Sequence, residues 1–146
     1  MAIYSVTRTS TALSTTNDLV TITAASGKPL RVILCQLSGM GTTSAANEVG
    51  LYRSTGGTTS GGAITPIATS SDSGAAGFTV ATTWTTQPTL GNLLWRFSVN
   101  ANGGADRFIA IPGAEITVPS AGQLSIRSIS GTSNVVLDIQ IEEIVG

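Results

Sequence analysis

Nucleophilic catalysis needs a serine or cysteine beside a base that removes its proton, and this chain of 146 residues lacks the usual base. Histidine, the commonest acid–base group and metal ligand, is absent from the sequence. The single cysteine, Cys35, lies among aliphatic residues, and no Gly-x-Ser-x-Gly motif occurs. We therefore expect Cys35 to be an inert thiol and the protein not to be an enzyme.

The acidic residues show no pattern typical of a catalytic pair or a metal site. Glycoside hydrolysis uses two carboxylates that flank the scissile bond, whereas those of this chain are scattered: Asp18, Glu48, Asp72, Asp106, Glu115, Asp138, Glu142 and Glu143. A calcium loop needs clustered oxygen ligands, and a hairpin explains Asn102 and Asp106 better than such a loop. We interpret the carboxylates as solubilising surface groups and expect no cofactor and no metal.

Two tryptophans are candidates for stacking on a sugar ring. Trp84 alternates in phase with Phe78, and Trp95 alternates in phase with Leu93 and Phe97. This pattern predicts inward-facing positions, so we expect both tryptophans to pack in a core or an interface. A carbohydrate-binding module normally exposes several aromatic residues, and only 5% of this chain is aromatic.

Charge is scarce throughout the sequence. Charged residues make up 10% of the chain, against about a quarter in ordinary soluble domains, and the net charge is −1. Without a basic field we expect no binding to nucleic acid. Lys28 is the only lysine, and arginine suits bidentate pairing with carboxylates at interfaces, although ordinary surface arginines are the alternative. We expect a surface of Thr, Ser, Gly and Asn that partners cover in part.

Neither end nor middle of the chain predicts a membrane segment. Residues 73–95 are free of charge, but Thr, Gly and Ser interrupt their apolar residues. The first residues lack the basic and apolar pattern of a secretory signal. We expect no membrane partner, and synthesis and assembly in a cytoplasm.

Apolar residues alternate along the chain, β-branched residues dominate, and no segment has a helical period. Strands are predicted over residues 2–8, 19–24, 30–37, 48–54, 63–68, 78–85, 93–99, 107–111, 115–118, 123–130 and 135–144. Hairpins are expected at 100–104 and 131–134, and Pro66 predicts an edge position for its strand. Without crossover helices the pairing must be mainly antiparallel. We predict an all-β, antiparallel β-sandwich, with a jelly roll as first choice and an immunoglobulin-like sandwich as second.

Residues 30–37 are apolar at both parities of the expected strand. One parity holds Leu30, Val32 and Leu34, and the other holds Ile33, Cys35 and Leu37. A strand that is apolar on both faces is covered on both faces, so we expect a loop or another subunit over the second face. The expected contacts with another copy or with a partner protein are Ile33, Cys35, Leu37, Arg31, Tyr4 and Val6.

The domain organisation is predicted as one sandwich preceded by an extended segment. Residues 1–16 are expected to form an N-terminal strand or arm with a Ser/Thr-rich tether, and residues 17–146 the sandwich. Such an arm can pair along the sheet edge of a neighbour.

The sequence resembles the small jelly-roll decoration (cement) proteins and related virion proteins of tailed bacteriophages. The resemblance is carried by Thr/Ser/Gly-rich loops, by residues 47–55 (NEVGLYRST) and by residues 116–127 (ITVPSAGQLSIR). It implies a virion structural protein on the capsid surface, a homotrimer or another homo-oligomer with the trimer favoured, that binds the major capsid protein and stabilises the head. A receptor- or carbohydrate-binding β-sandwich head of a phage fibre is the alternative.

Overall fold

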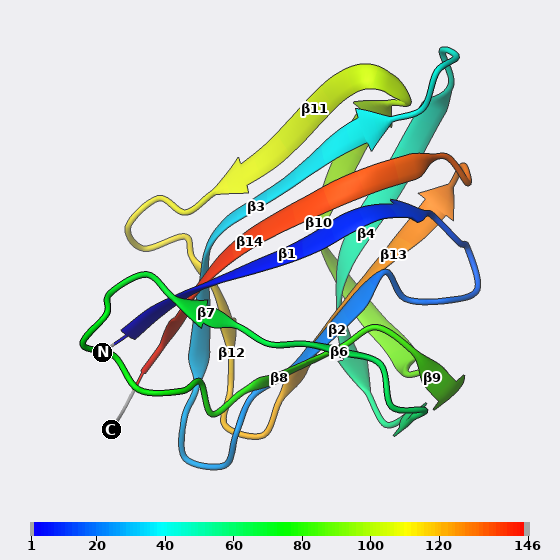
Figure 1. Ribbon diagram of the computed structural model, residues 1–146. Coiled ribbons are helices and arrows are strands. Elements are labelled where there is room, and N and C mark those ends of the chain that lie inside the picture. Colours follow the sequence, from blue (N-terminus) through cyan, green and yellow to red (C-terminus); the bar gives the residue numbers. More distant parts are fainter. Residues whose placement is uncertain (1, 145–146) are drawn as a thin grey trace.

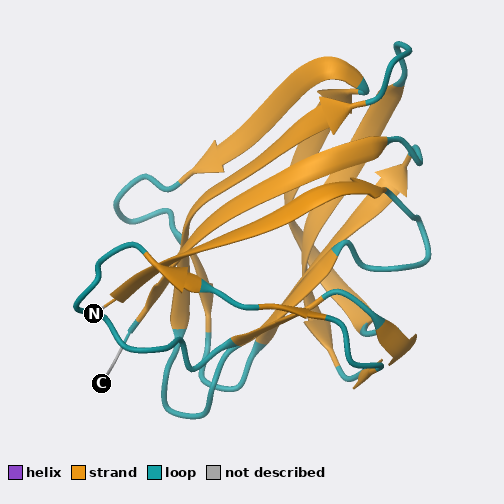
Figure 2. Ribbon diagram, in the orientation of Figure 1, coloured by secondary structure: helices purple, strands orange, loops and turns teal. Residues whose placement is uncertain are grey.

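The computed structural model describes residues 2–144, and every regular element in that range is a β-strand (Figures 1 and 2). This result confirms the all-β class that the alternating pattern predicts. The strands are β1 (Ala2–Ala12), β2 (Val20–Thr23), β3 (Leu30–Met40), β4 (Ala46–Thr55), β5 (Thr58–Thr59), β6 (Ala63–Ile64), β7 (Ile67–Ala68), β8 (Thr79–Ala81), β9 (Trp84–Thr86), β10 (Thr89–Asn100), β11 (Asn102–Ile109), β12 (Ile116–Val118), β13 (Gln123–Ser130) and β14 (Asn134–Glu143).

Two large antiparallel sheets pack against each other as a β-sandwich (Figure 1). Sheet A has the order β11-β3-β14-β1-β7, and β12 also pairs with β3. Sheet B has the order β10-β4-β13-β2-β8-β6. The short strands β5 and β9 pair with each other as a small third sheet.

The chain alternates between the sheets and then retraces its path. β1 to β4 lie in sheets A, B, A and B in turn, and β10, β11 with β12, β13 and β14 later pair with β4, β3, β2 and β1. The predicted hairpins at 100–104 and 131–134 are therefore wrong, because each connection joins strands of different sheets. Gly103 and Gly131 do have positive φ there, but such a turn redirects a chain between sheets as well as within one.

Inward positions of the strands form one core between the sheets. Along β14 the residues Val135, Leu137, Ile139 and Ile141 are buried, as their alternation predicts. Phe97 of β10 is also fully buried and is the largest such side chain. Period-2 alternation therefore identified the buried face correctly wherever a strand is regular.

The parity of β3 changes within the strand, and this corrects the expectation that both faces are apolar along its length and need a loop or another subunit to cover them. On the partner strand β14, Gln140 pairs with Leu34 and the next residue, Ile141, pairs with Val32. Ile33 is thus an extra residue, a β-bulge, and it reverses the parity of the strand. Leu30 and Val32 before the bulge, and Cys35 and Leu37 after it, all face the same core.

The N-terminal segment is a strand of the sandwich, not a separate arm. β1 pairs with β14 from Ala2 to Ala12, and Tyr4 and Val6 are buried in the core of their own chain. The accessible surface of 7046 Å² matches that of a compact monomer of 14.8 kDa, about 7000 Å². The expected division at residue 16 therefore does not separate two structural units, because sheet A of the same chain satisfies the backbone of β1.

Pro66 predicts an edge position, and the structure confirms it. β6, just before Pro66, pairs with β8 at the edge of sheet B. β7, just after it, pairs with β1 at the edge of sheet A. Proline has no N–H to donate to a ladder, so it lies where the chain passes from one sheet to the other.

Candidate functional site

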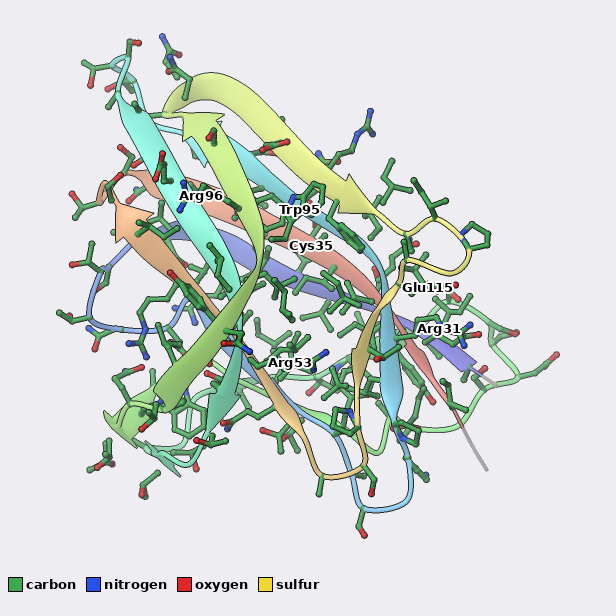
Figure 3. All side chains as sticks on the ribbon, turned by 180° about the vertical axis from the view of Figure 1, so that it is seen from behind. Arg31, Cys35, Arg53, Trp95, Arg96 and Glu115 are labelled. Carbon is green, nitrogen blue, oxygen red and sulfur yellow. The ribbon has the colours of Figure 1, made fainter. Side chains whose placement is uncertain are left out.

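The clearest candidate is a group of exposed apolar residues along β10 and β11, the outermost strands of the two sheets on one side of the sandwich. We call Trp95, Ile109 and Ile111 the edge patch; 41%, 53% and 68% of their surfaces are exposed. Trp95 packs against Phe108 of β11 with ring centroids 5.1 Å apart and planes nearly perpendicular. Figure 3 shows Trp95 between β10 and β11, whereas Arg96 points the other way. Edge strands with exposed apolar side chains are a common place for another chain to dock.

Trp95 and Leu93 were both predicted to face inward. The prediction is wrong for Leu93 and holds only in part for Trp95. β10 has irregular pairing with β4 between Leu90 and Leu93 and again between Leu93 and Trp95, with an extra residue each time. Leu93 is exposed and lies with the ring of Tyr52 over Gly50. Trp95 does face Phe108, but at the open side of the sandwich, where nothing in the described residues covers its outer part.

The two isoleucines of the edge patch lie at the end of β11 and just after it, at the parity opposite to Phe108, the residue that Trp95 contacts. Ile109 pairs with Leu34 of β3, whose side chain is half-buried, so the two form a cross-strand apolar pair. Ile111 follows in the turn that contains Gly113. Leu34 and its neighbour Ile33 are half-buried because the bulge turns this part of β3 away from the core.

Exposed arginines lie on the same two strands as the edge patch, with Arg107 at the parity of Ile109 and Arg96 pointing away from Trp95. Arg96 and Arg107 are exposed, and neither has a carboxylate within 4.0 Å in the described part of the chain. Asp106, next to Arg107, accepts hydrogen bonds from the backbone N–H groups of Ser98 and Arg107 (2.9 and 2.8 Å). Both guanidinium groups are therefore available to carboxylates of a partner.

The predicted contact residues are mostly not on the surface. Tyr4, Val6, Cys35 and Leu37 are at most 3% exposed, so they pack within the chain and present no surface to a partner. Ile33 is half-buried at the bulge. Arg31 pairs with Glu142 of the same chain, 3.1 Å away, and its Nε is buried without an acceptor in residues 2–144.

Sequence reasoning missed the edge patch because it assigned Trp95 to the interior and passed over the two isoleucines. A signal was present in the sequence: Ile109 and Ile111 share the parity opposite to Phe108. If Phe108 faces the core, these two isoleucines face outward.

Three carboxylates that were interpreted as surface groups are buried. The Asp18 side chain is fully buried and accepts hydrogen bonds from Arg127 Nε at 2.6 Å and from Thr21 Oγ1 at 2.5 Å. Glu143 accepts hydrogen bonds from the N–H groups of Gly77 and Phe78 (2.9 and 3.1 Å), and Glu142 is the partner of Arg31. These carboxylates bind groups of their own chain, and residues 2–144 contain no cluster of three potential metal-ligating side chains.

The thiol of Cys35 is buried in the core, where burial raises its pKa above the ordinary value of 9.0. The thiol of the unfolded chain ionises near pH 9, whereas the thiol of the folded protein stays neutral. The free energy of unfolding is therefore at its full value below pH 9 and falls as the pH rises above 9. Between pH 9 and 10 we expect the free energy of unfolding to fall by about 1 kcal/mol more in the wild type than in Cys35→Ala. Urea unfolding at the two pH values measures this difference. Rapid alkylation of the native thiol at pH 8 would contradict this placement.

Comparison with known protein families, with curated proteins and with solved structures finds no match for this chain. In residues 2–144 no helix is long and apolar enough to cross a membrane. The candidate function is therefore argued from the edge patch itself.

Proposed function

We propose that the protein is a structural subunit that assembles with copies of itself and with a larger lattice through the edge patch. The observation that carries this proposal is the exposure of Trp95 and Ile109 on the outermost strands of the two sheets, and of Ile111 just after β11. Tryptophan and arginine are enriched where protein interfaces bind most strongly, and the exposed Arg107 lies on β11 at the parity of Ile109.

Burial of the edge patch is the driving force for this association. Removing apolar surface from water contributes roughly 25 cal/mol per Å² before the entropy lost on association is subtracted. With charged residues at only 10% of the chain, little desolvation of ions opposes the contact. The Arg107 guanidinium adds specificity for a partner with a carboxylate at the matching position.

The assembly that we favour is a homotrimer with a jelly-roll subunit, decorating a bacteriophage head as a cement protein. The pairing of β1, β2, β3 and β4 with β14, β13, β11 and β10 supports the jelly roll, because one wrapped hairpin produces this order. The resemblance in residues 47–55 and 116–127 supports the virion role, with the major capsid protein as partner. In this role the protein needs no catalysis, no nucleic acid and no membrane.

Replacing both isoleucines of the edge patch by serine is expected to abolish self-association. The wild type should elute as an oligomer in size-exclusion chromatography with light scattering, and Ile109→Ser/Ile111→Ser as a monomer, because the apolar contact is lost. Ile67→Ser is the matched control, since Ile67 is 69% exposed on β7 at the opposite edge of sheet A. This variant should stay oligomeric.

Capsid binding is tested with empty phage heads built from a major capsid protein. The wild type should bind at regular sites and raise the temperature at which the heads disrupt, and Ile109→Ser/Ile111→Ser should do neither. A wild type that is monomeric at all concentrations and has no affinity for heads would overturn the proposal.

A further inference from the structure

A polar cavity of about 290 Å³ opens at the end of the sandwich where β1 stops. Its walls are the end of β1, the connection to β2 and the segment from β8 to Gln87, which lie on the same side of the molecule in Figure 1. The lining includes Arg8, Ser14, Asn17, Asp18, Trp84 and Gln87. This cavity is separate from the edge patch and shares no residue with it.

The cavity is polar because of the residues that follow the core positions in two segments. There the inward-facing positions hold side chains with hydrogen-bonding groups. In β1 the positions that hold Tyr4 and Val6 in the core are followed at the same parity by Arg8. In the second segment, Phe78 and Val80 are followed by Thr82 and then Trp84. The space between the sheets therefore continues beyond the apolar core as a cavity lined with hydrogen-bonding groups.

Three side chains of the lining hold N–H groups without an acceptor in the described residues. The Trp84 indole Nε1 is buried and unpartnered, while the opposite edge of the ring lies against Gly57. Arg8 donates from Nε to Thr11 Oγ1 and from Nη1 to the Thr82 carbonyl (both 3.2 Å), which leaves Nη2 unused. The Gln87 Oε1 accepts a hydrogen bond from the Asp18 N–H at 2.9 Å, which leaves the Nε2 group as a donor.

The charge of the cavity is positive. Asp18 is already bound by Arg127, and this pair is neutral, so Arg8 leaves a net charge of +1. Arg8 has no carboxylate within 4.0 Å in residues 2–144. Burial also lowers its pKa below the ordinary value, so a bound anion would stabilise the charged form of the guanidinium.

We propose that this cavity binds a sugar unit that has a carboxylate, such as a uronic acid. The carboxylate lies on Arg8, and the ring and hydroxyl oxygens accept hydrogen bonds from Trp84 Nε1 and Gln87 Nε2. The side chain of Asn17 lines the remaining wall for the sugar hydroxyl groups, whereas the Thr11 and Ser14 hydroxyls are already hydrogen-bonded within the chain. A volume near 300 Å³ lies at the lower end of small-molecule sites, which suits a single sugar unit. An apolar ligand would leave these donors without acceptors, so it has no comparable fit.

Titration with sodium glucuronate, followed by ¹H–¹⁵N correlation spectra of the full chain, tests the proposal. The Trp84 indole N–H signal should move saturably with a dissociation constant on the order of 1 mM. Glucose at equal concentration should bind at least about tenfold more weakly because it lacks the charge. Sodium acetate should also bind about tenfold more weakly because it makes only the contact with Arg8.

The variants separate the roles of the two main donors. Arg8→Gln should weaken glucuronate binding about tenfold or more, and Trp84→Phe, followed by backbone signals of the cavity, about fivefold. Arg96→Gln is the matched control because Arg96 is an exposed arginine on β10, outside the cavity, and it should bind as the wild type does. Unfolding temperatures of all variants check that each has folded.

Three results would overturn the proposal. No saturable shift with glucuronate removes the site altogether. If glucose binds as tightly as glucuronate, Arg8 does not bind the carboxylate. If acetate binds as tightly as glucuronate, the sugar ring contributes nothing to the affinity. Failure of self-association by the edge patch leaves this inference untouched, since the two sites share no residue.

Discussion

Replacing Asp18 with alanine is expected to lower the free energy of unfolding by about 3–5 kcal/mol. The Asp18 side chain is fully buried and its partner Arg127 is 12% exposed, so the variant leaves a guanidinium in the interior without its counter-charge. It also removes the acceptor of the Thr21 hydroxyl, which is buried with it. Urea unfolding followed by far-UV circular dichroism measures the change.

A double-mutant cycle shows whether the loss comes from the pair. Arg127→Met and Asp18→Ala together should destabilise by less than the sum of the single variants, because no unpaired charge is left behind. Asp72→Ala is the surface control, since Asp72 is exposed and its carboxylate makes no hydrogen bond or ion pair within residues 2–144. A loss below about 1 kcal/mol for Asp18→Ala would show that water reaches this pair.

The second large effect is expected at Gly39, where Gly39→Ala should destabilise the protein by about 3 kcal/mol. A methyl group on Gly39 would meet the carbonyl oxygens of Asn100 and Ala101, the second at 2.8 Å. These atoms belong to the backbone of the connection from β10 to β11, so they cannot swing away as a side chain can. The connection is further held by the hydrogen bond from the Gly41 N–H to the Ala101 carbonyl at 2.7 Å.

Gly74→Ala is the matched control for this prediction. Gly74 has no atom within 4 Å of the added carbon and has no positive φ, so its replacement should change the unfolding free energy by less than about 0.5 kcal/mol. Thermal unfolding of both variants beside the wild type is sufficient. Equal midpoints for the two variants would mean that the crossing between the sheets is looser than the structure shows.

The approximate positions of the long strands were predictable, whereas their partners were not. The predicted strands 63–68 and 78–85 are each two short strands in different sheets, and β5 was not predicted. Alternation along residues 135–144 identified the inward face of β14, and it depends only on the two-residue period of a strand. The predicted hairpins at 100–104 and 131–134 were wrong. Asn and Gly residues indicate that the chain turns, but they do not indicate whether the strands before and after the turn pair with each other. Pairing β1 with β14 joins residues more than a hundred positions apart, and no local pattern encodes that choice.

The candidate sites depended on features that local patterns do not contain. The bulge at Ile33 moved Cys35 and Leu37 into the core and removed the argument for a second covered face. The irregular pairing of β10 and its edge position exposed Trp95, which alternation alone had assigned to the interior. The cavity beside Trp84 joins residues 8 and 84, which come together only when the sheets close.

Composition and alternation alone established an all-β chain without histidine, with one buried cysteine and a surface poor in charge, because these properties belong to residue types and to the period of a single strand. Packing decided which apolar residues stay exposed, which carboxylates are paired in the interior and which polar groups share a cavity. These properties arise from contacts between distant segments, and a single inserted residue in a strand is enough to reverse them.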